Sequence, residues 1–154
     1  MPEGRIQLLT HRTEQTVWQP RWLSHPNGAI GLKSVVIAVS DLNEAGQRFE
    51  RLTGRRARAS AFALSFDLDR GSVDLVTAST FAVTCPQIPI PSLPFIGAYG
   101  IEVGSLEIAE RILRQGELTV QRRGDRCLVA AFPVELGCGA WLFTYPNAAS
   151  ADRK

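Results

Sequence analysis

The sequence predicts an α+β domain in which two βαβββ modules form one curved, eight-stranded mixed sheet. The main observation is a repeat: a β-branched strand, a capped amphipathic helix and further strands occur in residues 33–79 and again in residues 95–146. The length agrees with this, because 154 residues, 45% of them hydrophobic, fit one domain with a core of ordinary size. We therefore expect a single domain over residues 33–150, preceded by an arm.

The first module opens with the apolar run Ser34–Ser40, which has the length and β-branched content of a strand. Asp41 follows as a helix N-cap, with Glu44 in the capping-box position three residues later. Apolar residues then recur at helical spacing up to Gly54, the expected left-handed C-cap. The remaining strands of this module are expected at 62–66 and 73–77, around a turn at 69–71.

Residues 80–94 link the modules and contain four of the nine prolines. A proline has no backbone N–H to donate to a sheet, so we predict an extended crossing segment. The second module then repeats the first, with a strand at Tyr99–Val103, a helix N-cap at Ser105 and a helix end at Gly116. Its remaining strands are expected at 118–120, 126–131 and 139–145.

Residues 1–32 do not fit the repeat and are predicted to form an N-terminal arm with one strand and a turn. The strand is expected at 5–11, and the turn at His25–Ala29, because Asn27 and Gly28 tolerate positive φ. A strand without a local partner can pair with a sheet edge, either in its own chain or in a second copy. A homodimer through this strand is therefore one hypothesis.

Composition and charge exclude some classes of binding partner. The formal net charge of +2 is too small to indicate binding to nucleic acid or to an anionic membrane surface. No apolar run reaches the roughly 18 residues of a membrane span, and the first residues contain no apolar signal segment. The three cysteines have no metal-site spacing. We expect a reduced, cytoplasmic protein whose partner is a small molecule.

Paired βαβββ units that each open with an apolar strand and an Asp- or Ser-capped helix resemble the vicinal oxygen chelate (glyoxalase/bleomycin-resistance) superfamily. The segments Val35–Leu42 and Arg51–Gly54 look like the opening of such a module, and the resemblance covers about residues 33–146. It implies a glyoxalase-like fold. Trp22–Ala29 also resembles the lead-in to the second domain of glyoxalase-like domain proteins, which implies that the chain corresponds to a C-terminal half, encoded alone or taken from a longer protein.

The resemblance also implies a divalent metal inside the sheet, held by His and carboxylate side chains with positions left open for substrate. The family's ligand positions fall on Ser34, Asp74, Ala98 and Trp141. Of these only Asp74 is a good ligand. We therefore expect the usual metal centre to be absent, and no cofactor.

Strand alternation predicts which side chains face the cavity of the sheet. The cavity is expected to be mostly apolar and to bind a small, partly apolar molecule. Six side chains are predicted to line or border it: Ser34, Asp74, Glu102, Trp141, Phe143 and, as a proton carrier at the mouth, His25. Structural roles are the alternative: Asp74 on a solvated strand, Glu102 as a charge at the rim, Trp141 as space filler and His25 as a turn residue.

Three hypotheses about function remain open. The first is a small-molecule-binding protein without the metal centre. The second is a lyase, isomerase or dioxygenase, either metal-dependent or with a displaced site in which Asp74, Glu102 and His25 converge within about 5 Å. The third is an interaction role for the N-terminal strand.

Overall fold

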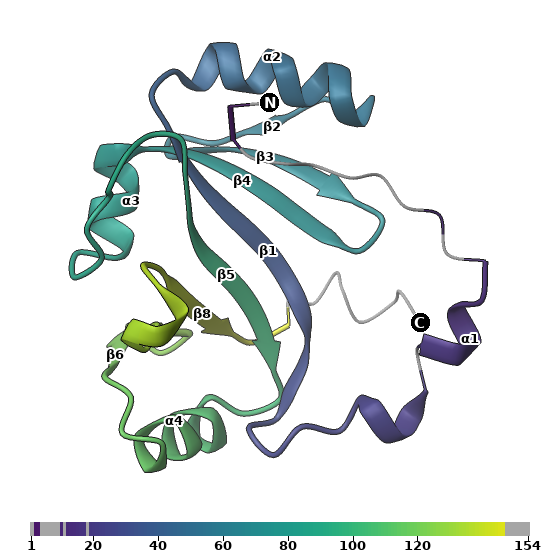
Figure 1. Ribbon diagram of the computed structural model, residues 1–154, viewed down its shortest axis with the longest axis vertical. Helices are drawn as coiled ribbons and strands as arrows, with labels where there is room; N and C mark the ends of the chain where they lie inside the picture. The colour runs from purple at the N-terminus through teal and green to yellow at the C-terminus, as the bar shows by residue number, and fades with distance from the viewer. Residues whose placement is uncertain (1, 4–9, 11, 18, 147–154) are drawn as a thin grey trace.

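The protein is described by a computed structural model over residues 2–3, 10, 12–17 and 19–146 (Figure 1). Eight strands form one mixed sheet in the order β2-β3-β4-β1-β5-β8-β7-β6. The strands are β1 (Ala29–Val39), β2 (Arg58–Ala59), β3 (Ala63–Leu68), β4 (Gly71–Thr77), β5 (Phe95–Val103), β6 (Val120–Arg123), β7 (Cys127–Ala131) and β8 (Ala140–Thr144). The helices are α1 (Glu14–Val17), α2 (Leu42–Thr53), α3 (Ala78–Thr84) and α4 (Leu106–Gln115), with 3-10 turns at Pro20–Trp22 and Val134–Leu136.

The predicted architecture is confirmed: β1, α2 and β2–β4 make the first module, and β5, α4 and β6–β8 the second. The modules join through antiparallel pairing of β1 with β5 at the centre of the sheet. Each central strand also pairs in parallel with the last strand of its own module, β1 with β4 and β5 with β8. Within the described part of the chain, no helix is long and apolar enough to cross a membrane.

Strand β1 begins at Ala29, five residues before the predicted strand and inside the predicted arm. Its early residues pair with β5, Ala29 with Val103 and Leu32 with Ile101. Pairing with a strand distant in sequence therefore extends β1 beyond its β-branched run. The predicted strand at 5–11 falls almost entirely outside the described residues and stays a prediction.

The helix starts follow the predicted capping chemistry. The Asp41 carboxylate accepts a hydrogen bond from the Glu44 N–H (2.9 Å), and the Ser105 hydroxyl accepts one from the Ile108 N–H (3.2 Å). Helix α2 ends at Gly54, whose φ of 66° is left-handed as predicted. Helix α4 ends differently, because Gly116 has a φ of −84° and the left-handed residue is Glu117, at 60°.

The predicted extended linker is wrong over its first part, because Ala78–Thr84 form helix α3. The Thr77 hydroxyl caps this helix by accepting a hydrogen bond from the Thr80 N–H (3.1 Å). No proline lies within α3; the prolines of the linker begin at Pro86. The helix stops just before them, as proline chemistry requires.

Helices pack on both faces of the sheet. On the outer face, Phe49 of α2 packs over the first module and Leu106 of α4 over the second, each within its own apolar cluster. These two helices lie at opposite ends of the molecule in Figure 1. On the inner face, α3 and the linker place Phe81, Cys85 and Ile88 against the centre of the sheet. Any site on the inner face must therefore lie beside α3.

The left-handed Glu117 gives a test of the α4 terminus. Because a non-glycine residue is strained at this φ, Glu117→Gly should raise the free energy of unfolding by up to about 1 kcal/mol. Chemical denaturation measures the change. Gly54→Ala is the matched control: it has open space around its added Cβ but a φ of 66°, so it should lower stability by a similar amount. Equal stabilities of Glu117→Gly and the parent would contradict this account.

Candidate functional site

The inner face of the central strands carries the first predicted site residues. Val36 of β1, Val76 of β4 and Ala98 of β5 all belong to the apolar cluster under α3. Side chains two residues along a strand share a face, which places Ser34, Asp74 and Glu102 on the inner face as well. Their predicted facing is confirmed.

The predicted facing of Trp141 and Phe143 is wrong. Ala140 and Leu142 are the β8 residues that pack with the inner cluster, whereas Phe143 is buried beneath α4 on the outer face. Trp141 packs against the same outer cluster and contacts the Phe132 ring, with 4.6 Å between centroids. Successive side chains of a strand point to opposite faces. The predicted alternation of β8 was shifted by one residue, so it placed both side chains on the wrong face.

The pairing register also corrects one of the family's metal positions. Val36 pairs with Asp74 in the first module as Gly100 pairs with Leu142 in the second, so Leu142, not Trp141, is the counterpart of Asp74. Ala98, another of the four positions, is fully buried in the cluster that contains Phe81.

The donors at the four corrected positions do not fit a metal ion. Ser34, Asp74, Ala98 and Leu142 provide one carboxylate, one weak hydroxyl ligand and two hydrocarbon side chains, whereas catalytic zinc sites, for example, have three protein ligands. Across the described residues, His, Cys, Asp and Glu side chains form no group of three or more arranged to hold a metal. No step through a metal is therefore derived for this chain.

Three polar side chains, which we call the inner polar strip, lie beside the α3 cluster: Ser34, Ser65 and Asp74. Asp74 is half-buried and pairs directly across the strands with Ser65 on one side and Val36 on the other. Ser34 and Ser65 are each only 8% exposed. Sequence reasoning missed Ser65, although its alternation with Ala63 along β3 could have identified it.

Among the described residues, neither hydroxyl of the inner polar strip makes a hydrogen bond, and Asp74 forms no hydrogen bond or ion pair but interacts electrostatically with Arg58. The fully buried side-chain atoms without a partner in the described part of the chain lie elsewhere, on Glu3, Arg48 and Gln87, so the Ser34 and Ser65 hydroxyls keep contact with solvent and are open to a ligand that replaces water. The Ser34 hydroxyl lies directly over Gly100, where a Cβ would be only 2.5 Å from the Ser34 Oγ, so glycine leaves room for this hydroxyl. The strip is therefore a candidate ligand site.

A second polar group lies on the inner face farther along the sheet. The Lys33 Nζ donates a hydrogen bond to the Thr144 Oγ1 of β8 (3.3 Å), and Thr144 is the cross-strand neighbour of Glu102. Glu102 pairs with Gly31 and Asp74 with Val36, which puts about 16 Å of β1 between the two carboxylates. The predicted convergence of Asp74 and Glu102 within about 5 Å is therefore wrong.

His25 lies in the turn that precedes β1. Its carbonyl accepts a hydrogen bond from the Gly28 N–H (2.9 Å), and Gly28 has the predicted positive φ, 72°. The residue is exposed. The predicted turn is confirmed, while the role of His25 as a proton carrier stays a prediction.

Two thiols border the inner cluster. Burial raises the pKa of Cys85 to about 11, and burial also raises the pKa of Cys127. The positive charge of Arg123, the cross-strand neighbour of Cys127, lowers the pKa of both thiols and so partly offsets the effect of burial. A thiol must ionise to act as a nucleophile, so Cys85 is an apolar packing residue here.

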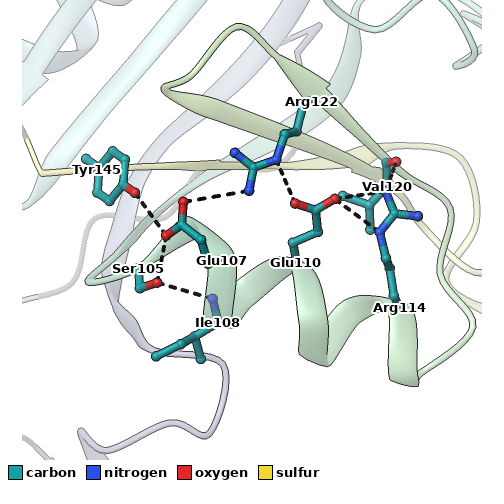
Figure 2. Close-up of polar contacts among 8 residues, drawn as sticks. All are labelled: Ser105, Glu107, Ile108, Glu110, Arg114, Val120, Arg122 and Tyr145. Atoms are coloured by element: carbon teal, nitrogen blue, oxygen red, sulfur yellow. Dashed lines mark hydrogen bonds and ion pairs between the residues drawn. The ribbon is translucent and has the colours of Figure 1, made fainter.

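On the outer face, charged residues tie α4 to the sheet edge at β6 (Figure 2). Arg122 donates to the Glu110 carboxylate (2.7 Å) and lies 3.7 Å from that of Glu107. Arg114 donates to Glu110 as well (2.8 Å) and to the Val120 carbonyl (3.3 Å). A depression of about 610 Å³ lies over this network. Because these charges satisfy one another and cover an exposed strand edge, we assign the network a structural role.

The network predicts an acid-sensitive contribution to stability. Hydrogen bonds from Arg114 and then Arg122 lower the pKa of Glu110, so this carboxylate stabilises the fold above its unfolded-state pKa and less as pH falls through the lowered value. Below the ordinary glutamate pKa of about 4.3, the parent should lose stability more steeply than Glu110→Gln.

Denaturant unfolding from pH 7 to pH 3 measures this difference. Glu135→Gln is the control, since Glu135 is exposed and forms no ion pair among the residues that the structure describes. Parallel pH profiles for the parent and Glu110→Gln would refute the assigned role.

Comparison with known proteins identifies the fold. No protein-family model and no curated protein matches this chain. Among solved structures, methylmalonyl-CoA epimerase from Mycobacterium tuberculosis matches with a TM-score of 0.63 at 17% identity, over 86% of this chain and 99% of that one. Methylmalonyl-CoA epimerase from Streptomyces coelicolor matches with a TM-score of 0.52 at 10% identity, over 74% and 94%. The chain has the vicinal oxygen chelate fold.

A third structure, the 2,3-dioxygenase LapB from Pseudomonas sp. KL28, matches with a TM-score of 0.51 at 14% identity, over 79% of this chain and 42% of that one. Identities this low establish the fold and leave the activity open.

Proposed function

We propose that this chain is a small-molecule-binding protein with the vicinal oxygen chelate fold whose ligand binds at the inner polar strip without a metal ion. The observation that carries the proposal is the strip itself: Ser34, Ser65 and Asp74 are buried or half-buried and form no hydrogen bond or ion pair among the described residues. A ligand that supplies hydrogen bonds would satisfy all three.

The surroundings of the strip favour a partly apolar ligand. Val36 and Val76 flank Asp74 on the inner face, and Leu142 lies beyond Gly100 in the next strand pair. Pockets for small molecules are typically apolar, with a few placed polar groups that fix orientation. A ligand of this kind would pack its hydrocarbon part against these side chains and its polar part against the strip.

An enzyme remains the second candidate, because the similar structures include epimerases and a dioxygenase. Metal-dependent chemistry would need donors that the four family positions lack. The binding role therefore has the stronger support. The three free cysteines of the structure agree with the proposed cytoplasmic location, and dimerisation through the N-terminal strand stays a prediction.

A thermal-shift screen of a small-molecule library, run with and without EDTA, tests the proposal. A ligand at 100 times its Kd stabilises the folded state by about 2.7 kcal/mol, which such a screen detects readily. We expect ligands whose Kd is unchanged by EDTA and rises about threefold to tenfold in Ser34→Ala, which loses one hydrogen bond.

Ser24→Ala, an exposed serine of the arm, is the matched control and should bind as the parent does. Ligands that bind only with a divalent ion present, or that bind Ser34→Ala as tightly as the parent, would contradict the proposal.

A further inference from the structure

The hydrogen-bonding groups of the inner polar strip indicate which class of ligand it can bind. The Asp74 carboxylate can only accept hydrogen bonds when ionised, and the hydroxyls of Ser65 and Ser34 add further acceptor positions. Both serines are more than nine-tenths buried on the face to which Asp74 belongs, and neither has a partner in the described part of the chain. The strip therefore offers acceptors and a negative charge to whatever occupies it.

The nearest cation does not neutralise Asp74. Arg58 lies on β2, two strands from Asp74, and donates to the exposed Asp67 carboxylate from Nε (3.3 Å) and from Nη2 (3.4 Å). That hydrogen-bonded pair is the main cause of the raised pKa of Arg58, and Asp74 contributes least to it. Arg58 thus forms its ion pair with Asp67, and Asp74 has no ion pair among the described residues.

The other inner-face cations lie away from the strip. Lys33 reaches across β5 to Thr144 on β8, in the direction opposite to β4. Arg123 lies on β6, five strands from β4, within electrostatic range of Cys85 and Cys127. Asp74 therefore has a weak electrostatic interaction with Arg58 and no ion pair among the described residues, so a cationic ligand would add to its charge compensation.

Building on the proposed function, we propose that the ligand carries an organic ammonium group, which binds Asp74 and the hydroxyl of its cross-strand neighbour Ser65. A primary ammonium has three N–H donors and no acceptor, which suits a carboxylate and a hydroxyl that can both accept, with one N–H left for water. Hydrogen bonds between charged partners are about twice as strong as neutral ones, and partial burial strengthens them further. The apolar body of the same ligand packs on Val36 and Val76 of the inner cluster, which flank Asp74.

Three probes with a common aromatic body test this assignment: 2-phenylethylamine, 2-phenylethanol and 3-phenylpropionate. Titration of the ¹⁵N-labelled full chain by NMR gives a Kd for each. We expect the amine to bind about tenfold more tightly than the alcohol, and the carboxylate to bind most weakly. Asp74→Asn keeps the shape of the side chain and removes its charge, so it should weaken amine binding about tenfold and leave alcohol binding within about twofold.

Two variants serve as controls. Asp69→Asn removes an exposed carboxylate of the same module, and Arg123→Gln removes the distant inner-face cation. Both should bind the amine as the parent does. Unfolding curves of all variants establish that each one is folded.

The outcomes separate this inference from the proposed function. Equal binding of amine and alcohol, or an unchanged amine Kd in Asp74→Asn, overturns the ammonium assignment. Preferred binding of 3-phenylpropionate that is lost in Arg123→Gln overturns it too, while the inner face remains a ligand site. If no probe binds and the library screen yields only neutral or anionic ligands, the ammonium assignment alone falls. If neither experiment yields a ligand, both proposals fall.

Discussion

The packing of α3 against the inner face of the sheet is the interaction on which the rest of this structure depends. Phe81, Cys85 and Ile88 are almost fully buried against Ala38 and Ala98. Burying a large apolar side chain contributes roughly 1.5–3 kcal/mol relative to leaving it exposed, so these contacts fix the linker firmly to the sheet. In doing so they cover one of the positions at which the family resemblance places a metal ligand, and they restrict polar chemistry to what lies beside α3.

The two modules consequently differ in what they offer. The same pairing geometry places Asp74 opposite Val36 in the first module and Leu142 opposite Gly100 in the second. The first module thus carries a carboxylate with serine neighbours, whereas the second carries the hydrocarbon of Leu142 and, at Gly100, no side chain. The two modules share one fold but present different inner faces because their side chains differ, which illustrates why fold similarity does not transfer activity.

The sequence was most informative where structure is determined locally. The caps at Asp41 and Ser105 and the left-handed Gly54 follow from hydrogen-bonding and steric preferences of a few adjacent residues, so the strand-to-helix junctions were predictable. Strand alternation likewise placed Ser34 and Asp74 correctly, because each lies two residues from an apolar core position.

Errors arose where distant contacts decide the outcome. Helix α3 carries a Thr77 cap that sequence reasoning passed over, because the prolines further along dominated the interpretation of the linker. The face of β8 depends on its register with β5, and no local signal distinguishes Trp141 inward from Trp141 outward. Similarly, the separation of Glu102 from Asp74 follows from the pairing of β1 with β5, which only the assembled sheet reveals.

The proposed function rests on an inner face on which α3 packs over one of the family's metal positions and the polar strip binds its ligand without a metal ion. Its most direct test is the amount of divalent metal bound per chain, measured by elemental analysis after equilibration with Mn, Fe, Ni and Zn and removal of the excess. The account predicts no tightly bound ion, because Asp74 alone provides too few ligands. One ion retained per chain, and lost in Asp74→Ala, would contradict it.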